Sequence, residues 1–187
     1  MKLGKFNINV IDTGVFKLDG GAMFGVVPKV LWAKKYNHGD ELNRIPLAAR
    51  PMVIEFDNKK ILVDTGNGSK REAKFNNMYD IDPDKNDLQI GLKKFGLTTD
   101  DITDVILTHL HFDHTGGSTK LENGKLAPTF GNAKYYVQES HYKWAINPKD
   151  KDKASFIKDD FELLIEEGLI QFTNGSTELF DGISLIP

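Results

Sequence analysis

The segment from Thr108 to Gly117 constrains this chain more than any other part of its sequence. It reads Thr-His-Leu-His-Phe-Asp-His-Thr-Gly-Gly and holds four metal-capable side chains within six residues: His109, His111, Asp113 and His114. The chain has five histidines in all, and three of them lie in this segment. Imidazole nitrogens and a carboxylate are ligands that suit zinc and neighbouring divalent metals. This density of ligands predicts a metal site.

The spacing of these ligands predicts how the backbone presents them. The apolar, partly β-branched run Val105–Leu107 precedes them and indicates a buried strand. Side chains alternate along an extended chain, so His109, His111 and Asp113 can point to one side. The pattern therefore predicts a strand that leads directly into a ligand-bearing loop.

His114 breaks this alternation, so a turn must deliver it, and the Gly116–Gly117 pair is expected to supply that turn. Two pairs of ligands that approach from different angles favour two metal ions over one. Dinuclear hydrolytic sites hold their metals roughly 3.5–4 Å apart. The cluster therefore favours a two-metal hydrolytic centre.

The motif His-x-His-x-Asp-His followed by Gly-Gly resembles that of the metallo-β-lactamase superfamily. The segment Lys60–Gly66 strengthens the resemblance, because it looks like the strand of that family that ends in Asp-Thr-Gly. Segments Gly25–Trp32 and Asn43–Arg50 look like the branch that holds quorum-quenching N-acyl-homoserine-lactone lactonases and methyl-parathion-type hydrolases. The resemblance covers essentially the whole chain.

The resemblance implies an α+β fold, the αββα sandwich, with two divalent metal ions, zinc first and manganese, cobalt or iron as alternatives. His109 and His111 would hold the first metal, and Asp113 and His114 the second. Asp113 and Asp64 would be the catalytic carboxylates, with Asp64 orienting a ligand through a hydrogen bond. The competing interpretation of Asp64 is a strand-end turn residue. Thr108 and Thr115 are expected to be structural, with ligand orientation as the alternative. The implied reaction is hydrolysis of a lactone or ester by metal-activated hydroxide.

The chain departs from the family pattern at its end. The family completes its metal site with three further ligands downstream, whereas this chain stops at Ser184–Pro187. We therefore expect residues 1–187 to be one domain, mainly the N-terminal half of the fold, with its C-terminal part missing and its metal site incomplete. The alternatives are a catalytically silent half-domain, or a thioesterase or phosphodiesterase of the same superfamily. Because the inner sheet face would be uncovered, we expect a homo-oligomer or association with the missing half.

Composition narrows the classes of partner that the protein is expected to bind. A net charge of −3 without a block of lysine or arginine argues against a nucleic-acid surface. A small-molecule substrate is what the resemblance implies. The absence of cysteine excludes disulfides and thiolate metal sites. No long apolar stretch indicates a signal peptide or membrane span, so the expected location is the cytoplasm.

Patterning elsewhere predicts the supporting elements. We expect a β-hairpin over 52–63, a helix from Leu88 that ends before Gly96, and helices over 139–146 and 156–165. Residues 25–50 lack a clear period and predict a long ordered loop. Trp32 and Tyr36 in that loop, and Phe24 just before it, are either pocket walls or packing residues. His141 is interpreted as a surface or packing residue, and Asp104 as a turn or strand-edge residue without a role.

Overall fold

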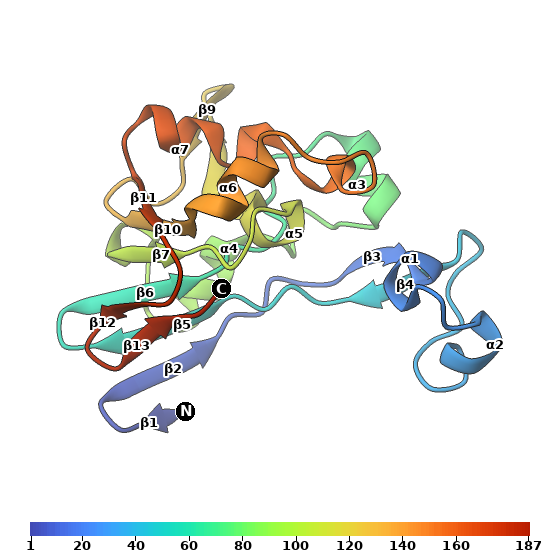
Figure 1. Ribbon diagram of the computed structural model, residues 1–187, viewed down its shortest axis with the longest axis horizontal. Coiled ribbons are helices and arrows are strands. Elements are labelled where there is room, and N and C mark those ends of the chain that lie inside the picture. The colour runs from blue at the N-terminus through green and yellow to red at the C-terminus, as the bar shows by residue number, and fades with distance from the viewer.

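The computed structural model describes residues 1–187 and is built around a seven-stranded mixed sheet in the order β1-β2-β5-β6-β7-β10-β11 (Figure 1). Its strands are β1 (Lys2–Leu3), β2 (Phe6–Val10), β5 (Met52–Phe56), β6 (Lys59–Val63), β7 (Asp104–Ile106), β10 (Lys134–Gln138) and β11 (Ile170–Thr173). Strands β1 to β6 pair antiparallel, and the predicted hairpin over 52–63 is β5 and β6. From β6 to β11 the neighbours pair parallel. The carboxyl ends of β6, β7 and β10 therefore lie at one edge of the sheet.

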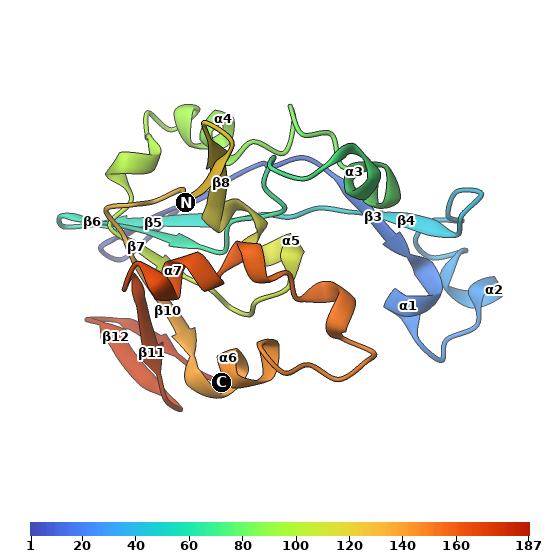
Figure 2. The same ribbon diagram turned by 90° about the horizontal axis from the view of Figure 1, so that it is seen from above.

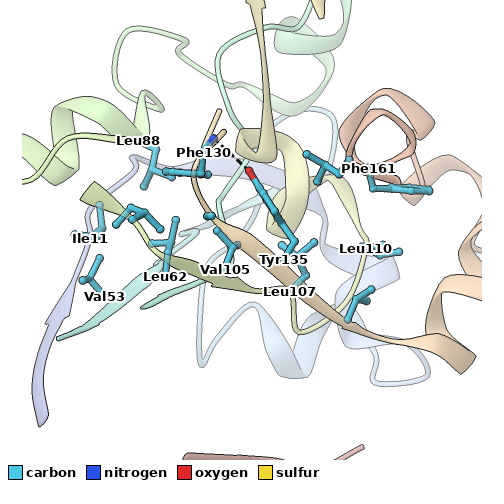
Figure 3. Close-up of a cluster of buried hydrophobic side chains, with 14 of the residues drawn as sticks. Ile11, Val53, Leu62, Leu88, Val105, Leu107, Leu110, Phe130, Tyr135 and Phe161 are labelled. Carbon is cyan, nitrogen blue, oxygen red and sulfur yellow. Dashed lines mark hydrogen bonds between the residues drawn. The ribbon is translucent and has the colours of Figure 1, made fainter. Parts of the chain in front are cut away.

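One face of the sheet is covered by helices α4 (Leu88–Lys93), α6 (Glu139–Ala145) and α7 (Glu162–Glu166). Alternation along the strands turns Val53, Leu62 and Val105 toward them, where they join a cluster of 18 buried residues (Figure 3). Tyr135 lies fully buried in this cluster because its hydroxyl accepts a hydrogen bond from Phe130 N–H and donates one to the Ser118 carbonyl. Each fully buried aliphatic side chain here contributes roughly 1.5–3 kcal/mol.

The strand side chains that point away from the helices form the opposite face of the sheet. A small hairpin packs on this face. This hairpin consists of β12 (Thr177–Phe180) and β13 (Ile183–Leu185), which pair antiparallel. Its apolar side chains contact Ile54, Ile61 and Ile106 of the sheet. The sheet face that we expected to be bare is therefore partly covered, although an apolar cavity of about 320 Å³ lies between hairpin and sheet.

An arm projects from the body, at the right of Figures 1 and 2. Strands β3 (Phe16–Asp19) and β4 (Arg44–Leu47) pair antiparallel and carry helices α1 (Gly20–Phe24) and α2 (Lys29–Trp32). The predicted long loop over 25–50 thus contains regular structure. Trp32 is buried and stacks on Phe24 at 4.8 Å between ring centroids, in a small core that belongs to the arm.

The remaining elements surround the metal motif or join the layers. They are α3 (Ala73–Tyr79), α5 (Phe112–Thr115), β8 (Thr119–Glu122) and β9 (Lys125–Pro128), together with short 3-10 turns. None of the helices in the structure combines the length and the apolar character that crossing a membrane requires.

Buried ion pairs occur at two positions that figure in the sequence-based expectations. The predicted helix over 156–165 begins only at Glu162, after a turn that buries Asp160 completely against Lys70 and Arg71. Asp104 is the first residue of β7 and is buried, with Lys59 Nζ at 2.9 Å from its carboxylate. A charged side chain is tolerated in such places only when it is paired.

Candidate metal centre

The candidate metal centre lies where β6 and β7 end. These neighbouring parallel strands pair Val63 with Ile106, so the loops that follow them emerge side by side. The N–H of Asp64 continues the ladder by donating to the Ile106 carbonyl at 2.8 Å. Asp64 then adopts a left-handed backbone conformation with φ of 57°, which aspartate tolerates better than most residues. This turn directs the Asp64 side chain toward the loop after β7.

The two loops are in direct contact, and the glycine pair allows it. Thr65 N–H donates to the His114 carbonyl at 2.7 Å. A Cβ atom on Gly116 would lie 2.0 Å from the Asn67 carbonyl oxygen, and one on Gly117 would lie 2.3 Å from the Thr65 carbonyl oxygen. Neither glycine has a positive φ. The pair therefore serves close approach of two backbones, and the prediction that it forms the turn delivering His114 was wrong.

The one-turn helix α5 performs that delivery instead. His111 is its N-cap residue, and its carbonyl accepts the N–H groups of His114 and Thr115 at 2.9 and 3.0 Å. Asp113 and His114 both lie on α5, so the extended alternation ends at His111. Helical geometry places consecutive side chains about 100° apart, which is why Asp113 and His114 approach the centre from different directions.

The structure brings the four predicted ligand residues together. The ring of His109 has its centroid 4.6 Å from that of His111 and 3.9 Å from that of His114. Asp113 Oδ2 lies 3.4 Å from His114 Nε2. The four side chains thus form one cluster although they come from a loop and a helix.

Asp64 and Thr108 form the layer behind this cluster. Asp64 Oδ2 lies 2.7 Å from His114 Nδ1, and Asp64 Oδ1 accepts the Thr108 N–H at 2.8 Å. The Thr108 hydroxyl is 2.8 Å from Asp64 Oδ2 and 3.1 Å from His109 Nδ1. Thr108 therefore links Asp64 to one of the histidines, which agrees with the alternative in which it orients a ligand.

The surroundings of the imidazoles set their charge in the metal-free state. Burial, with repulsion from His114 and His111, lowers the pKa of His109 to about 4, and burial also lowers the pKa of His111. Burial acts in the same direction on His114, but hydrogen bonds to Asp113 and Asp64 outweigh it and raise its pKa to about 9. His109 and His111 are therefore neutral at neutral pH, as a metal ligand must be, whereas His114 is protonated in the metal-free state and would release that proton on binding a metal.

Two observations test whether a metal fits here. One is the chemistry of the ligand side chains, and the other is a buried nitrogen atom that has no hydrogen-bond partner. The side chains do not form a finished coordination site, since no three His, Cys, Asp or Glu groups are arranged to hold an ion. The donor set of imidazoles and a carboxylate nevertheless suits zinc. In addition, His111 Nε2 is buried without any hydrogen-bond partner. A buried polar atom without a partner is costly, and a metal would satisfy it. The residues present therefore fit a divalent metal.

A cavity of about 230 Å³ adjoins the cluster. Asp64, Asp113 and His114 line one side of it, and the other side is formed by Phe16 and residues 47–51 at the base of the arm. Phe24, Trp32 and Tyr36 do not line it, because they pack within the arm. A larger cavity of about 480 Å³ near Phe75 contains none of the motif side chains.

Sequence reasoning missed one residue that contacts the motif. The N–H of Leu110 donates to Nε2 of His141 at 2.8 Å, across 31 residues of sequence. Nothing in the local pattern around His141 indicates this contact. The only available signal was chemical, because His141 and the exposed His38 are the two histidines outside the motif.

The metal motif lies within a segment that matches a known protein family. A family model described as the metallo-beta-lactamase superfamily matches residues 45–183. The N-acyl homoserine lactonase AttM of Agrobacterium fabrum is 33% identical over 88 residues, which cover 46% of this chain and 29% of AttM.

Solved structures extend the likeness to nearly the whole chain. A probable metal-dependent hydrolase from Staphylococcus aureus is 32% identical with a TM-score of 0.86, covering 98% of this chain and 64% of that protein. The dizinc quorum-quenching lactonase AidC is 20% identical with a TM-score of 0.72, covering 97% of this chain and 62% of AidC, which shows likeness of fold. The chain thus spans less than two thirds of the length of these proteins.

Proposed function

The chain belongs to the metallo-beta-lactamase superfamily, and on this premise we propose that it carries the metal motif of a hydrolase that acts on lactones or related esters. The observation that carries the proposal is the meeting of two loops at one sheet edge. They bring Asp64 from the end of β6 against His114 from the loop after β7, beside the other motif ligands. Superfamily membership fits this geometry.

We assign the side chains as follows. His109 and His111 hold one divalent metal ion, Asp113 and His114 hold a second, and zinc is the first candidate. A bound divalent metal supplies Lewis-acid chemistry, since it acidifies water and polarises a carbonyl group. Asp64 holds Nδ1 of His114, which leaves Nε2 of that ring for the metal side of the cluster.

The substrate class is supported by the cavity and by the relatives. The cavity beside Asp113 combines apolar side chains, among them Phe16 and Leu47, with the polar groups of the motif and Arg50, and it suits a small organic molecule. The relatives AttM and AidC are described as lactonases. We therefore propose a neutral lactone or ester as substrate. The metal ligands would stand on one side of the reacting carbonyl and the base of the arm on the other.

Metal content and turnover test the proposal together. The purified protein is loaded with zinc, cobalt or manganese, its metal content is measured by plasma emission, and lactone and aryl-ester hydrolysis is followed. We expect metal to bind, and we expect His109→Ala with His111→Ala to remove the ion that these two histidines hold. We expect weaker retention than at a four-ligand zinc site, because each ion has two ligands in this chain. His38→Ala, at an exposed histidine outside the motif, is the matched control and should change nothing.

The outcomes separate the parts of the proposal. Metal content that stays unchanged in the double variant would refute the ligand assignment. Metal binding accompanied by cleavage of thioesters or phosphodiesters, but not of lactones or esters, would reject the substrate class. Metal binding without any turnover would favour a catalytically silent domain.

A further inference from the structure

His141 lies outside the metal motif yet stands beside it. It belongs to α6, which starts directly after β10. Its ring centroid is 6.1 Å from that of His109, 5.6 Å from that of Trp144 and 5.7 Å from that of Phe156. The ring is half-buried between the motif and these two aromatic side chains. This packing holds the imidazole in one place.

The ring accepts a hydrogen bond from the backbone of the motif. The Leu110 N–H donates to His141 Nε2 at 2.8 Å. An imidazole nitrogen accepts only when it carries no proton, so His141 must be neutral with its proton on Nδ1. Nε2 is thereby occupied by the Leu110 N–H. His141 is thus an acceptor for the motif backbone and not a further ligand in this arrangement.

The N–H of Leu110 lies between two regular elements, although the neighbouring His111 forms an isolated antiparallel bridge with Phe156. Strand β7 ends at Ile106, the last ladder bond is donated by Leu107 to the Tyr136 carbonyl, and α5 begins at Phe112. Leu110 itself is fully buried. A buried N–H needs an acceptor, and the one that the structure provides is His141. The contact therefore fixes the peptide that joins His109 to Leu110.

We propose that His141 is a positioning residue: its Nε2 holds the Leu110 N–H and thereby fixes the directions in which His109 and His111 present their imidazoles to a metal. This inference rests on the proposed function, because it concerns the same metal centre. Partners that orient ligands from behind typically change metal affinity by 10–100-fold when they are removed. The proposal assigns such a role to a side chain that contacts the backbone between two ligands.

Two variants of His141 separate the effect of its hydrogen-bond acceptor from the effect of its side-chain packing. His141→Leu removes the acceptor, whereas His141→Gln can place an amide oxygen near the position of Nε2. Amide hydrogen exchange at Leu110 is measured by NMR in the metal-free protein, and cobalt affinity by competition with a chelator. We expect His141→Leu to speed exchange at Leu110 on the order of tenfold and to weaken cobalt binding by about 10–100-fold. We expect His141→Gln to retain most of the exchange protection at Leu110 and most of the cobalt affinity.

Matched variants of His38 serve as controls, and a second pair of His141 variants is available if the first does not fold. His38→Leu and His38→Gln make the same changes at an exposed histidine of the arm and should leave both readouts unchanged. Circular dichroism reports whether each variant folds. If His141→Leu does not fold, His141→Gln is compared with His141→Asn, whose shorter amide does not reach Leu110. The Asn variant should then show the faster exchange and the weaker binding.

Three results would overturn or delimit the proposal. Unchanged Leu110 exchange in folded His141→Leu would overturn it. Equal losses in the Leu and Gln variants would also overturn it, because ring packing and not the acceptor would then matter. A wild-type protein that binds no cobalt would contradict the proposed function, and with it the metal-positioning role, while Leu110 exchange would still report whether His141 holds the loop.

Discussion

Asp64 and His114 lie 50 residues apart in sequence, and their side chains meet at 2.7 Å between Oδ2 and Nδ1. The contact joins the loop after β6 to the helix α5 after β7. It holds the His114 ring with Nδ1 toward Asp64 and Nε2 toward Asp113. Because the same carboxylate also accepts hydrogen bonds from Thr108, its position is fixed on two sides.

We expect Asp64→Asn to weaken zinc or cobalt binding by about 10–100-fold without unfolding the protein. An amide retains the shape and tolerates the left-handed backbone, but it loses the charge that orients His114. Chelator competition measures the affinity. Asp57→Asn is the matched control, since Asp57 is exposed and also has a positive φ, of 47°. Equal affinities in the two variants would show that Asp64 has only a backbone role.

We expect Gly116→Ala to destabilise the protein by about 1–3 kcal/mol or more, because overpacking forces backbone shifts. The added Cβ would lie 2.0 Å from the carbonyl oxygen of Asn67, which cannot move away without breaking the contact of the two loops. Gly131→Ala has no heavy atom within 4 Å of its new Cβ and should change stability by less than about 0.5 kcal/mol. Urea unfolding of both variants provides the comparison. Similar midpoints would contradict the packing described for Gly116.

We expect the metal-free protein to lose stability on both sides of neutral pH. The pKa of His109 is lowered to about 4 in the folded state, so the unfolded state binds more protons as pH falls from about 6.5 toward 4, and stability declines there. The pKa of His114 is raised to about 9, so its contribution is present below about pH 6.5 and declines as pH rises to 9.

Thermal unfolding midpoints between pH 4 and 9.5, with a chelator present, test this dependence. His109→Asn should flatten the acid side, and His114→Asn should flatten the alkaline side. His38→Asn should retain the wild-type profile, because that side chain is exposed and lies on the arm. A profile that neither motif variant changes would contradict the assigned pKa shifts.

We expect the protein to self-associate at micromolar concentration through apolar side chains of the arm. Val26 is fully exposed, and Val30, Leu31 and Leu42 are each more than half exposed. Contiguous apolar patches of more than a few hundred Å² commonly mark interfaces. Light scattering should show a mass above that of one chain, and Val26→Lys with Val30→Lys should reduce it. Ile90→Lys, at a half-exposed position on α4, is the control, and a single-chain mass at every concentration would refute the prediction.

Local patterns predicted the elements whose form depends on near neighbours. The hairpin of β5 and β6 follows from apolar alternation and the turn between them, and α4 follows from Leu88 and Leu92 at helical spacing. Gly96 has a positive φ in the turn that follows α4, whose C-cap residue is Lys94. The metal motif was recognised from the types of its ligand residues and their spacing. These features are encoded within a few residues of where they occur.

Elements shaped by distant contacts were described less well. The segment around Asp160 has helical spacing, yet its carboxylate is buried against Lys70 and Arg71, and the helix starts later. The role of the Gly116–Gly117 pair was misjudged for the same reason, since the backbone that it meets comes from residues 65–67. A sequence pattern reports periodicity, but it does not report which segment lies opposite.

The sequence by itself determined the ligand types, their spacing and the family to which they point, because those depend on side-chain chemistry and local order. Only the tertiary structure decided that Asp64 reaches His114 and that His141 holds Leu110. Both contacts depend on the pairing of β6 with β7 and of β7 with β10. The physical reason is that parallel strands bring their carboxyl ends to one edge, where residues far apart in sequence become neighbours.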